Sequence, residues 1–188
     1  MYKVKGKPWA YSGAIDVSDC ATAKEVMLKA GINFNVAKCE LVGKMPIKLT
    51  GTDEELDRII KEQKEGAHVF GTDIYRKCDN AFATYRTDYN IPLGVVKSKY
   101  TIVQNNDAFN FFDDAIGKNS AIWQTAGFCG NGERIFVSAK LPNNILVKGD
   151  PVENYLVFTN THDGSGGVKI LFTPIRAVSY THLRAHET

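Results

Sequence analysis

The stretch that decides the fold runs from Tyr85 to Val178. It reads YRTDYNIPLGVVKSKYTIVQNNDAFNFFDDAIG, then WQTAGFCGNGERIFVSAKLP, then YLVFTNTHDGSGG and FTPIRAV. An extended run and a short amphipathic helix come first, and four strand-like segments separated by turn signals follow. Sequential strands joined by short turns favour an antiparallel β-sheet meander with the helix packed on one face. We therefore predict an α+β fold.

The predicted sheet is built from two pairs of strands. Ile122–Phe128 and Arg134–Leu141 flank CGNGE, and Tyr155–Asn160 and Val168–Thr173 flank THDGSGG. The glycines of both connections supply the positive φ that tight turns require. Both connections are therefore predicted to be hairpin turns.

The helix of this block is predicted to begin at Asn106. Its apolar residues recur at i, i+3, i+4, i+7 and i+8, which places them on one wide face. We expect this face to pack on the sheet, because so large an aromatic area needs a partner surface. The residues of the face are Ala108, Phe111, Phe112, Ala115 and Ile116.

The N-terminal segment is predicted to hold two further helices, over 22–31 and 52–66. Each opens with a capping-box pattern and ends at a glycine. In the second helix we expect Leu56, Ile59 and Ile60 to face inward.

Three further segments carry strand or turn signals. Phe34–Val42 alternates between apolar and polar residues, and Gly94–Gln104 is rich in β-branched residues. Cys78, Asp79 and Asn80 are predicted to form a hairpin turn between two extended runs.

Length and composition bound the class of protein. The chain has 188 residues, of which 44% are hydrophobic and 23% charged, with a net charge of +2. These values are typical of one folded domain, which we place at residues 1–178. No run is apolar enough for a membrane span or a signal peptide, so we expect a cytoplasmic protein without a membrane partner.

The last ten residues, SYTHLRAHET at 179–188, differ from what precedes them. They resemble translated sequencing-adapter sequence, and we treat them as a non-native tail. On this interpretation we expect the natural protein to continue beyond Val178.

Four cysteines are spaced too irregularly for a zinc site or a dense disulfide scaffold. We expect free thiols, no metal and no cofactor. The cysteines are Cys20, Cys39, Cys78 and Cys129.

The most reactive-looking cluster is His162-Asp163-Gly164-Ser165, with a base, an acid and a hydroxyl. Hydrolytic triads draw their members from separate parts of a chain, so that each orients the next. We therefore interpret this segment first as a turn. A ligand-contacting loop that uses His162, Asp163 and Ser165 remains an alternative, and catalytic residues are not assigned.

Cations and aromatic residues alternate on the predicted sheet. Residues two apart on a strand share a face, so the face away from the helix would combine positive charge with aromatic rings. Such a surface suits single-stranded nucleic acid, because bases stack on rings while lysine and arginine meet phosphates. A merely solvated face is the alternative. The candidate contacts are Arg86, Lys97, Lys99, Tyr100, Arg134, Phe136, Lys140 and Arg176, with Tyr85 nearby.

The chain also resembles a known family. The segments RTD, LGVV, VQN, TAGFCGNGERIFVSAKLP, THDGSGG and TPIRAV, with KPWAYSGAIDV near the N-terminus, are similar to the phage/plasmid-like protein family, catalogued as domain of unknown function family 932. The resemblance implies a mobile genetic element in a bacterial host and brings no established activity. Ala10 stands where that family often has histidine, which argues against a role for this position. Family-pattern residues present here include Arg86, Asp88, Gly94, Tyr100, Gln104, Asn105, His162, Asp163, Gly164 and Arg176.

Three hypotheses on function follow. The first is a non-enzymatic protein that binds single-stranded nucleic acid in recombination or replication of a mobile element. The second is a protein-binding module, such as an anti-defence factor that acts on a host protein, which predicts an exposed acidic or apolar patch instead of a basic one. The third is an unrecognised hydrolase, which requires the His162 loop to open into a concave pocket.

Overall fold

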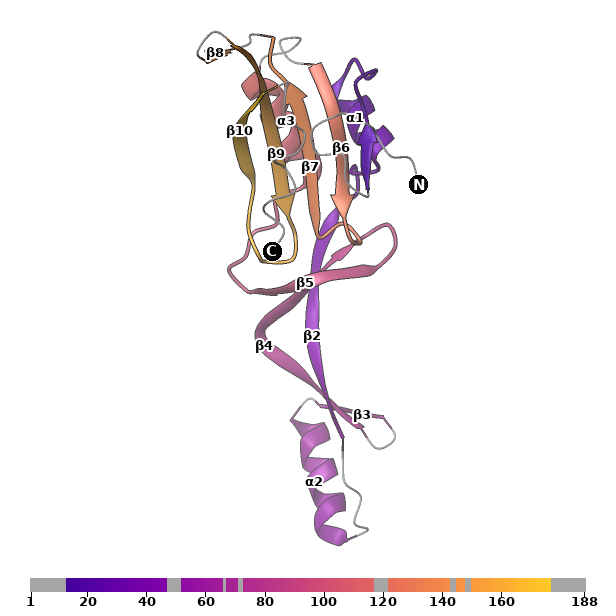
Figure 1. The fold of residues 1–188 in the computed structure, drawn as a ribbon. Helices are drawn as coiled ribbons and strands as arrows, with labels where there is room; N and C mark the ends of the chain where they lie inside the picture. Colours follow the sequence, from indigo (N-terminus) through magenta and orange to yellow (C-terminus); the bar gives the residue numbers. More distant parts are fainter. Residues whose placement is uncertain are drawn as a thin grey trace.

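Two antiparallel sheets and three helices make up the part of the chain that the computed structural model describes (Figure 1). This mixture of helices and antiparallel sheets confirms the predicted α+β class. No helix within these residues is long and apolar enough to cross a membrane. The residues described are 13–46, 52–65, 67–70, 73–116, 122–142, 145–147 and 150–176, so the tail at 179–188 lies outside them.

The larger sheet has six antiparallel strands. Gly130 and Gly132 adopt φ of 59° and 116°, which permits the tight turn between its second and third strands. Four strands follow the order β6-β7-β9-β10, with β1 beside β6 and β8 paired with β9 (Figure 1). Their bounds are β1 Ala14–Asp16, β6 Ile122–Cys129, β7 Arg134–Lys140, β8 Ile145–Val147, β9 Asp150–Thr161 and β10 Lys169–Arg176.

Two helices, α1 (Ala23–Ala30) and α3 (Asn105–Ile116), pack on one face of this sheet. Thr22 and Glu25 form the capping box that opens α1, and Gly31 closes it with a φ of 65°. In α3, Phe109 and Phe112 lie fully buried against aromatic rings of the sheet. The ring centroids of Phe109 and Trp123 are 5.3 Å apart, as are those of Phe112 and Phe158.

The apolar face predicted for α3 is wrong at Phe111, while the side chains of Ala115 and Ile116 lie outside the described residues. Phe111 is 62% exposed, whereas Phe109, which the prediction left out, is fully buried. Residues 105, 108, 109 and 112 follow the i, i+3, i+4, i+7 spacing, and this stripe is the one that the sheet covers. Phe111 lies about 100° away from Phe112 around the helix and so misses the core.

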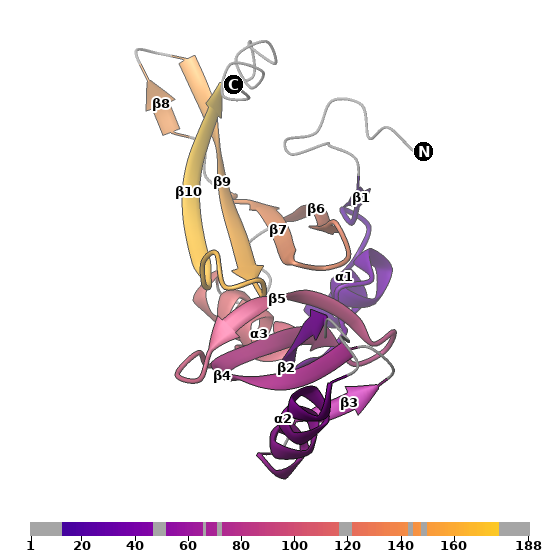
Figure 2. The ribbon, with the colours of Figure 1, turned by 90° about the horizontal axis from the view of Figure 1, so that it is seen from below.

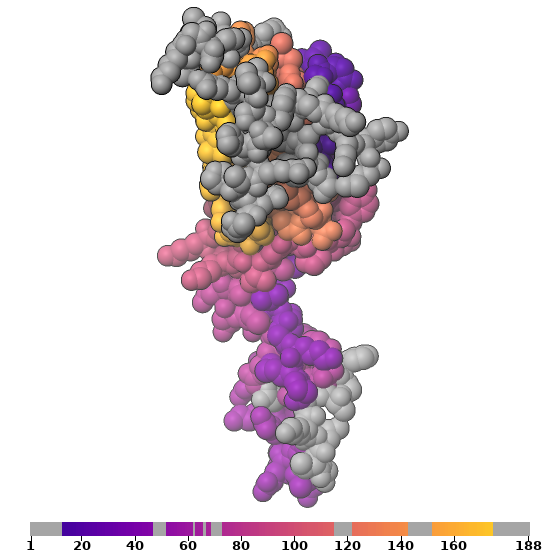
Figure 3. Space-filling model, in the orientation of Figure 1, coloured from indigo at the N-terminus to yellow at the C-terminus, as the bar shows by residue number. Residues whose placement is uncertain are grey.

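The smaller sheet forms an arm. Its long strands β2 and β4 extend away from the six-stranded sheet, and Figure 3 shows them as a narrow neck. Seen from below, β5 crosses close to the ends of β7 and β9 (Figure 2). The bounds are β2 Val36–Pro46, β3 His68–Phe70, β4 Asp73–Arg86, β5 Ile91–Lys97 and, at the end of the arm, α2 Asp53–Lys64.

The hairpin turn predicted at Cys78-Asp79-Asn80 is wrong, because β4 continues through these residues. The register between β2 and β4 shifts there, from Glu40 opposite Phe82 to Val42 opposite Lys77. Asn80 adopts a φ of 58° in this irregular stretch. These turn-favouring residues therefore form part of a bulge inside one strand.

Two further predictions for the arm need correction. The strand expected over Gly94–Gln104 ends at Lys97, and a turn follows it. In α2, Leu56 and Ile60 are exposed, not inward-facing. The described neighbour of α2 is the short strand β3, and a three-residue strand cannot cover a helix face.

Candidate functional site

The loop that follows β9 docks on β5, at the junction of the two sheets. A Cβ built on Gly94 would lie 2.5 Å from the Cα of Asp163 and 2.6 Å from its carbonyl oxygen, so the two backbones touch. The Thr84 hydroxyl donates a hydrogen bond to the His162 carbonyl at 2.6 Å. Gly164 turns with a φ of 82°, which confirms the predicted turn chemistry. Glycine at both positions lets the loop approach β5 this closely.

His162 belongs to a buried network with Asn105 and Asn160. The Asn160 side-chain nitrogen donates to the Val103 carbonyl at 2.9 Å and to Asn105 Oδ1 at 3.2 Å. Asn105 Oδ1 is therefore an acceptor, so His162 Nε2, 2.7 Å from it, must carry the proton. The Asn105 amide nitrogen donates to the Phe34 carbonyl at 3.3 Å.

This arrangement keeps His162 neutral. Its Nδ1 is buried without a hydrogen-bond partner among the described residues, so a second proton there would find no acceptor. Burial lowers the pKa of His162 to about 4, although the nearby Asp163 charge works in the opposite direction. The imidazole is thus an uncharged part of the junction near pH 7.

Arg86 is held at the same junction. Its guanidinium binds both carboxylate oxygens of Asp88, at 3.0 and 2.7 Å, and donates to the Asn131 carbonyl at 2.9 Å. It also lies 3.9 Å from the centre of the Phe34 ring. This pairing lowers the pKa of Asp88 below its ordinary value. Because Arg86 is almost fully buried and each of its three guanidinium nitrogens already donates a hydrogen bond, it is not available to a phosphate.

Tyr100 and Gln104 fasten the segment between β5 and α3. The Tyr100 hydroxyl donates to the Thr161 carbonyl at 2.9 Å, and burial raises the pKa of this phenol. The Gln104 amide binds both the N–H and the carbonyl of Val36, at 3.0 and 2.8 Å. Both side chains therefore tie the arm to the larger sheet.

The His162-Asp163-Ser165 cluster does not have the geometry of a hydrolytic site. The histidine ring lies in the buried network, while Asp163 Oδ1 accepts a hydrogen bond from the Ser165 backbone N–H at 2.8 Å. Burial works to raise the pKa of Asp163, but the Ser165 hydrogen bonds and the charge of Arg134 hold it below its ordinary value. Asp163 thus shapes the turn and does not orient the imidazole.

The candidate nucleic-acid contacts do not form one surface. Phe136 is only 3% exposed, and its ring lies beside Gly127 on the neighbouring strand. Lys140, at the far end of β7, is paired with Glu153. The expectation that these side chains emerge together into water is therefore wrong.

The remaining candidates divide between the two sheets. Lys97 and Lys99 are exposed, the first at the end of β5 and the second in the following turn, so they do not share one strand face. Arg134 is exposed at the start of β7, near Asp163. The side chain of Arg176 lies outside the described residues.

A comparison with models of known protein families finds a match in the C-terminal half of the chain. Residues 92–180 match the model of a domain of unknown function, DUF932. This chain carries a DUF932 domain. The matched segment runs from β5 to β10 and includes the docked loop, Asn105 and His162. No curated protein and no solved structure matches the chain.

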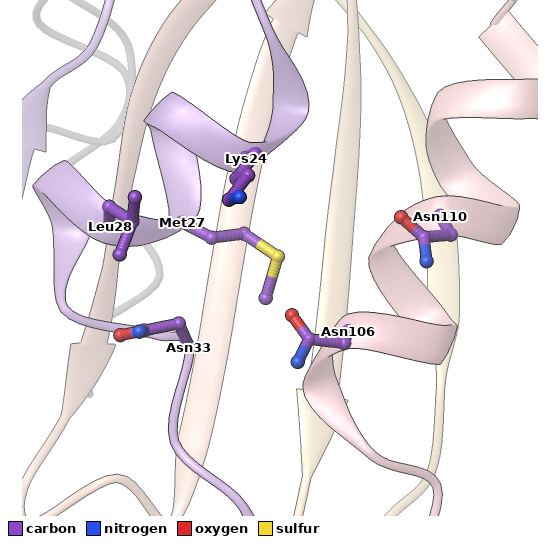
Figure 4. Close-up of a pocket in the computed structure, with 6 residues that line it drawn as sticks. All are labelled: Lys24, Met27, Leu28, Asn33, Asn106 and Asn110. Atoms are coloured by element: carbon purple, nitrogen blue, oxygen red, sulfur yellow. The ribbon is translucent and has the colours of Figure 1, made fainter.

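A groove of about 310 Å³ lies between α1 and α3. Figure 4 shows the Met27 side chain reaching between the two helices, with Lys24 and Leu28 on one wall. Asn106 and Asn110 form the other wall, and Asn33 lies at its end. Its described lining residues offer amides and one ammonium group, and none of them is a carboxylate, thiol or imidazole for acid–base or nucleophilic chemistry. In the part of the chain that the structure describes, no group of three or more His, Cys, Asp or Glu residues could hold a metal.

A second exposed feature of the DUF932 domain is the edge strand β10. Leu171 and Phe172 are 48% and 52% exposed, and Ile170 and Val168 are also exposed. Adjacent strand residues point to opposite faces, so β10 is apolar on both faces, and none of the described strands pairs with its outer edge.

Sequence reasoning missed both the asparagine network and the apolar edge. Asn105 and Asn160 lie far apart in the sequence, and they meet only because the start of α3 packs against β9. The edge had a signal, since KILFTPIR contains apolar residues at consecutive positions. That run predicts a strand, but it does not reveal whether the two faces of the strand are covered.

Proposed function

We propose that the DUF932 domain of this protein is a non-enzymatic protein-binding module that adds a strand of its partner to β10. The observation that carries the proposal is an edge strand with apolar side chains on both faces and no charge between Lys169 and Arg176. Natural edge strands are usually protected by charges, proline, bulges or short length. In β10 such residues stand only toward the ends, at Lys169, Pro174 and Arg176, so the stretch 170–173 is suited to β-augmentation.

The backbone of β10 supports this proposal. The Asn154 carbonyl accepts a hydrogen bond from Leu141 N–H on the β7 side, at 2.8 Å. Asn154 therefore directs its backbone groups away from β10, and its partner there, Pro174, has its nitrogen on the open edge. Residues two apart on a strand direct their backbone groups to the same side. The N–H and carbonyl groups of Ile170 and Phe172 therefore also point to the open edge of β10.

The partner that the family resemblance suggests is a polypeptide of the bacterial host or of the mobile element itself. In that setting the module would act as an anti-defence factor or as an assembly part. The exposed apolar patch is the feature that separates this function from polynucleotide binding, which needs an exposed basic surface.

Binding of single-stranded nucleic acid is the second candidate function. Lys97 and Lys99 favour it, because both are exposed and neither forms an ion pair with another described residue. A salt series distinguishes it, since log affinity falls with log salt by roughly 0.7 for each phosphate contacted on a single strand. A slope smaller by about 0.7 in Lys97→Glu than in the wild type would support this candidate, and no binding at low salt would remove it.

Site-specific photocrosslinking tests the leading proposal. With the photoreactive analogue benzoylphenylalanine in place of Phe172, irradiated cells should yield a covalent adduct with another polypeptide. The matched control is the same analogue in place of Tyr89, which is 69% exposed in the turn between β4 and β5. Adducts should be on the order of tenfold more abundant at 172. Equal yields at both positions, or none at 172, would overturn the proposal.

A further inference from the structure

We propose that the strand added to β10 comes from a second copy of this chain, paired antiparallel across a twofold axis at Leu171. This inference rests on the proposed function and names its partner. An isologous contact of this kind uses the same surface on both copies, so the strand must be complementary to itself. The backbone, the side chains and the charges of β10 each meet that condition.

The backbone condition selects the register. Only residues whose N–H and carbonyl groups face the open edge can pair there, and Ile170 and Phe172 are two of them. With Leu171 opposite Leu171 of the second copy, Ile170 lies opposite Phe172 and exchanges two hydrogen bonds with it. The twofold axis generates a second such pair, in which Phe172 of the first copy lies opposite Ile170 of the second. Pro174, which lacks a donor, then lies opposite Val168 and needs to supply only its carbonyl.

The side chains fit the same register. Ile170 and Phe172 pair with Phe158 and Leu156 of β9, so they lie on the sheet face that carries the helices. Across the axis, Ile170 of each copy would cover Phe172 of the other. Leu171 would meet its own equivalent on the opposite face.

Helix α3 extends this apolar surface. Asn106 and Asn110 face α1, so Phe111, on the opposite flank of α3, lies toward the β10 side. From that flank its exposed ring would point toward the helix-side face of β10, where Ile170 and Phe172 are also exposed. Pairing would thus join the exposed apolar residues of α3 and β10 in each copy into one larger cluster.

The charges do not oppose this pairing. In the proposed register Lys169 lies opposite Thr173 and Arg176 opposite Gly166, so no like charges face one another. The other described edge strands are less suitable. β1, β3 and β8 have three residues each, β2 carries Lys38, Glu40 and Lys44, and the pairing of β5 contains a register shift.

Cysteine substitution tests the register directly. Facing residues of a non-hydrogen-bonded antiparallel pair have Cα atoms about 4.5 Å apart, which a disulfide can span. Leu171→Cys should therefore form a covalent dimer with oxidised glutathione as the oxidant. Thr173→Cys is the matched control, on the same strand face and with the same native cysteines. Its two copies would lie about 14 Å apart, four residues of strand rise.

We expect on the order of tenfold more disulfide dimer from Leu171→Cys than from Thr173→Cys, and wild-type protein that dimerises with concentration in sedimentation equilibrium. Equal crosslinking, or wild-type protein that stays monomeric at every concentration, overturns the second copy as partner. If the protein is monomeric yet the analogue at Phe172 captures a different polypeptide in cells, the proposed function holds and only this inference fails. If neither occurs, both fail.

Discussion

Replacement of Gly94 by alanine is expected to lower the free energy of unfolding by about 3 kcal/mol. The added methyl group would lie 2.5 to 2.8 Å from three backbone atoms of Asp163, and backbone held in a strand-to-loop junction cannot move aside as a side chain can. Relief requires the docked loop to lift from β5, which also loosens the Thr84 hydrogen bond to His162. Urea denaturation followed by circular dichroism measures the change.

Gly167→Ala is the matched control for this substitution. Nothing lies within 4 Å of a Cβ built at Gly167, so alanine there should change stability by less than about 0.5 kcal/mol. If Gly94→Ala proves as mild as Gly167→Ala, the loop does not dock on β5 as described.

Asn105→Ala is expected to cost about 3 kcal/mol as well, for a different reason. The substitution leaves the His162 Nε2–H and the Phe34 carbonyl without their partner inside the protein, and it removes one of two acceptors from Asn160. A buried donor or acceptor left unpaired costs its full desolvation, which exceeds the net value of the hydrogen bond it made.

Asn110→Ala provides the comparison on the same helix. Asn110 is exposed and lines the groove between α1 and α3, so its loss should change the unfolding midpoint little. The midpoints of thermal unfolding of both variants and the wild type, measured at the same pH, give the difference. A result in which the two variants are equally stable would contradict the buried network.

These two predictions give the family-pattern residues a structural meaning. Gly94, Asn105, His162 and Asp163 come from separate parts of the sequence and meet where the arm joins the larger sheet. Arg86, Tyr100 and Gln104 fasten the same junction. Most of their polar atoms are hydrogen-bonded to other described residues, so these side chains hold the arm on the larger sheet.

The fold class could be predicted because the signals for it are local. Alternation in Arg134–Lys140 and the glycine turns determine strands and their antiparallel order without reference to distant residues. The turn at Gly164 was predictable for the same reason. The mixed α+β class and this turn are therefore confirmed by the structure.

The predicted surface failed because exposure depends on what packs over each face of the sheet. Phe136 is buried although Ile135 and Val137, its neighbours in the strand, face the helices, and no period within its own strand reveals that. Lys97 and Lys99 separate because the strand ends between them. Phe111 is exposed because the buried stripe of α3 begins at Asn105, a polar residue that a hydrophobic pattern does not select.

The most direct test of the account is residue-resolved hydrogen–deuterium exchange along β10. At low protein concentration the amides of Ile170 and Phe172 should exchange rapidly, because they face the open edge, while those of Leu171 and Thr173 should be protected by β9. On raising the concentration, Ile170 and Phe172 should become protected as a partner strand binds. Rapid exchange of both amides at every concentration, in the purified protein and in cell extract alike, would contradict the claim that β10 is a binding edge.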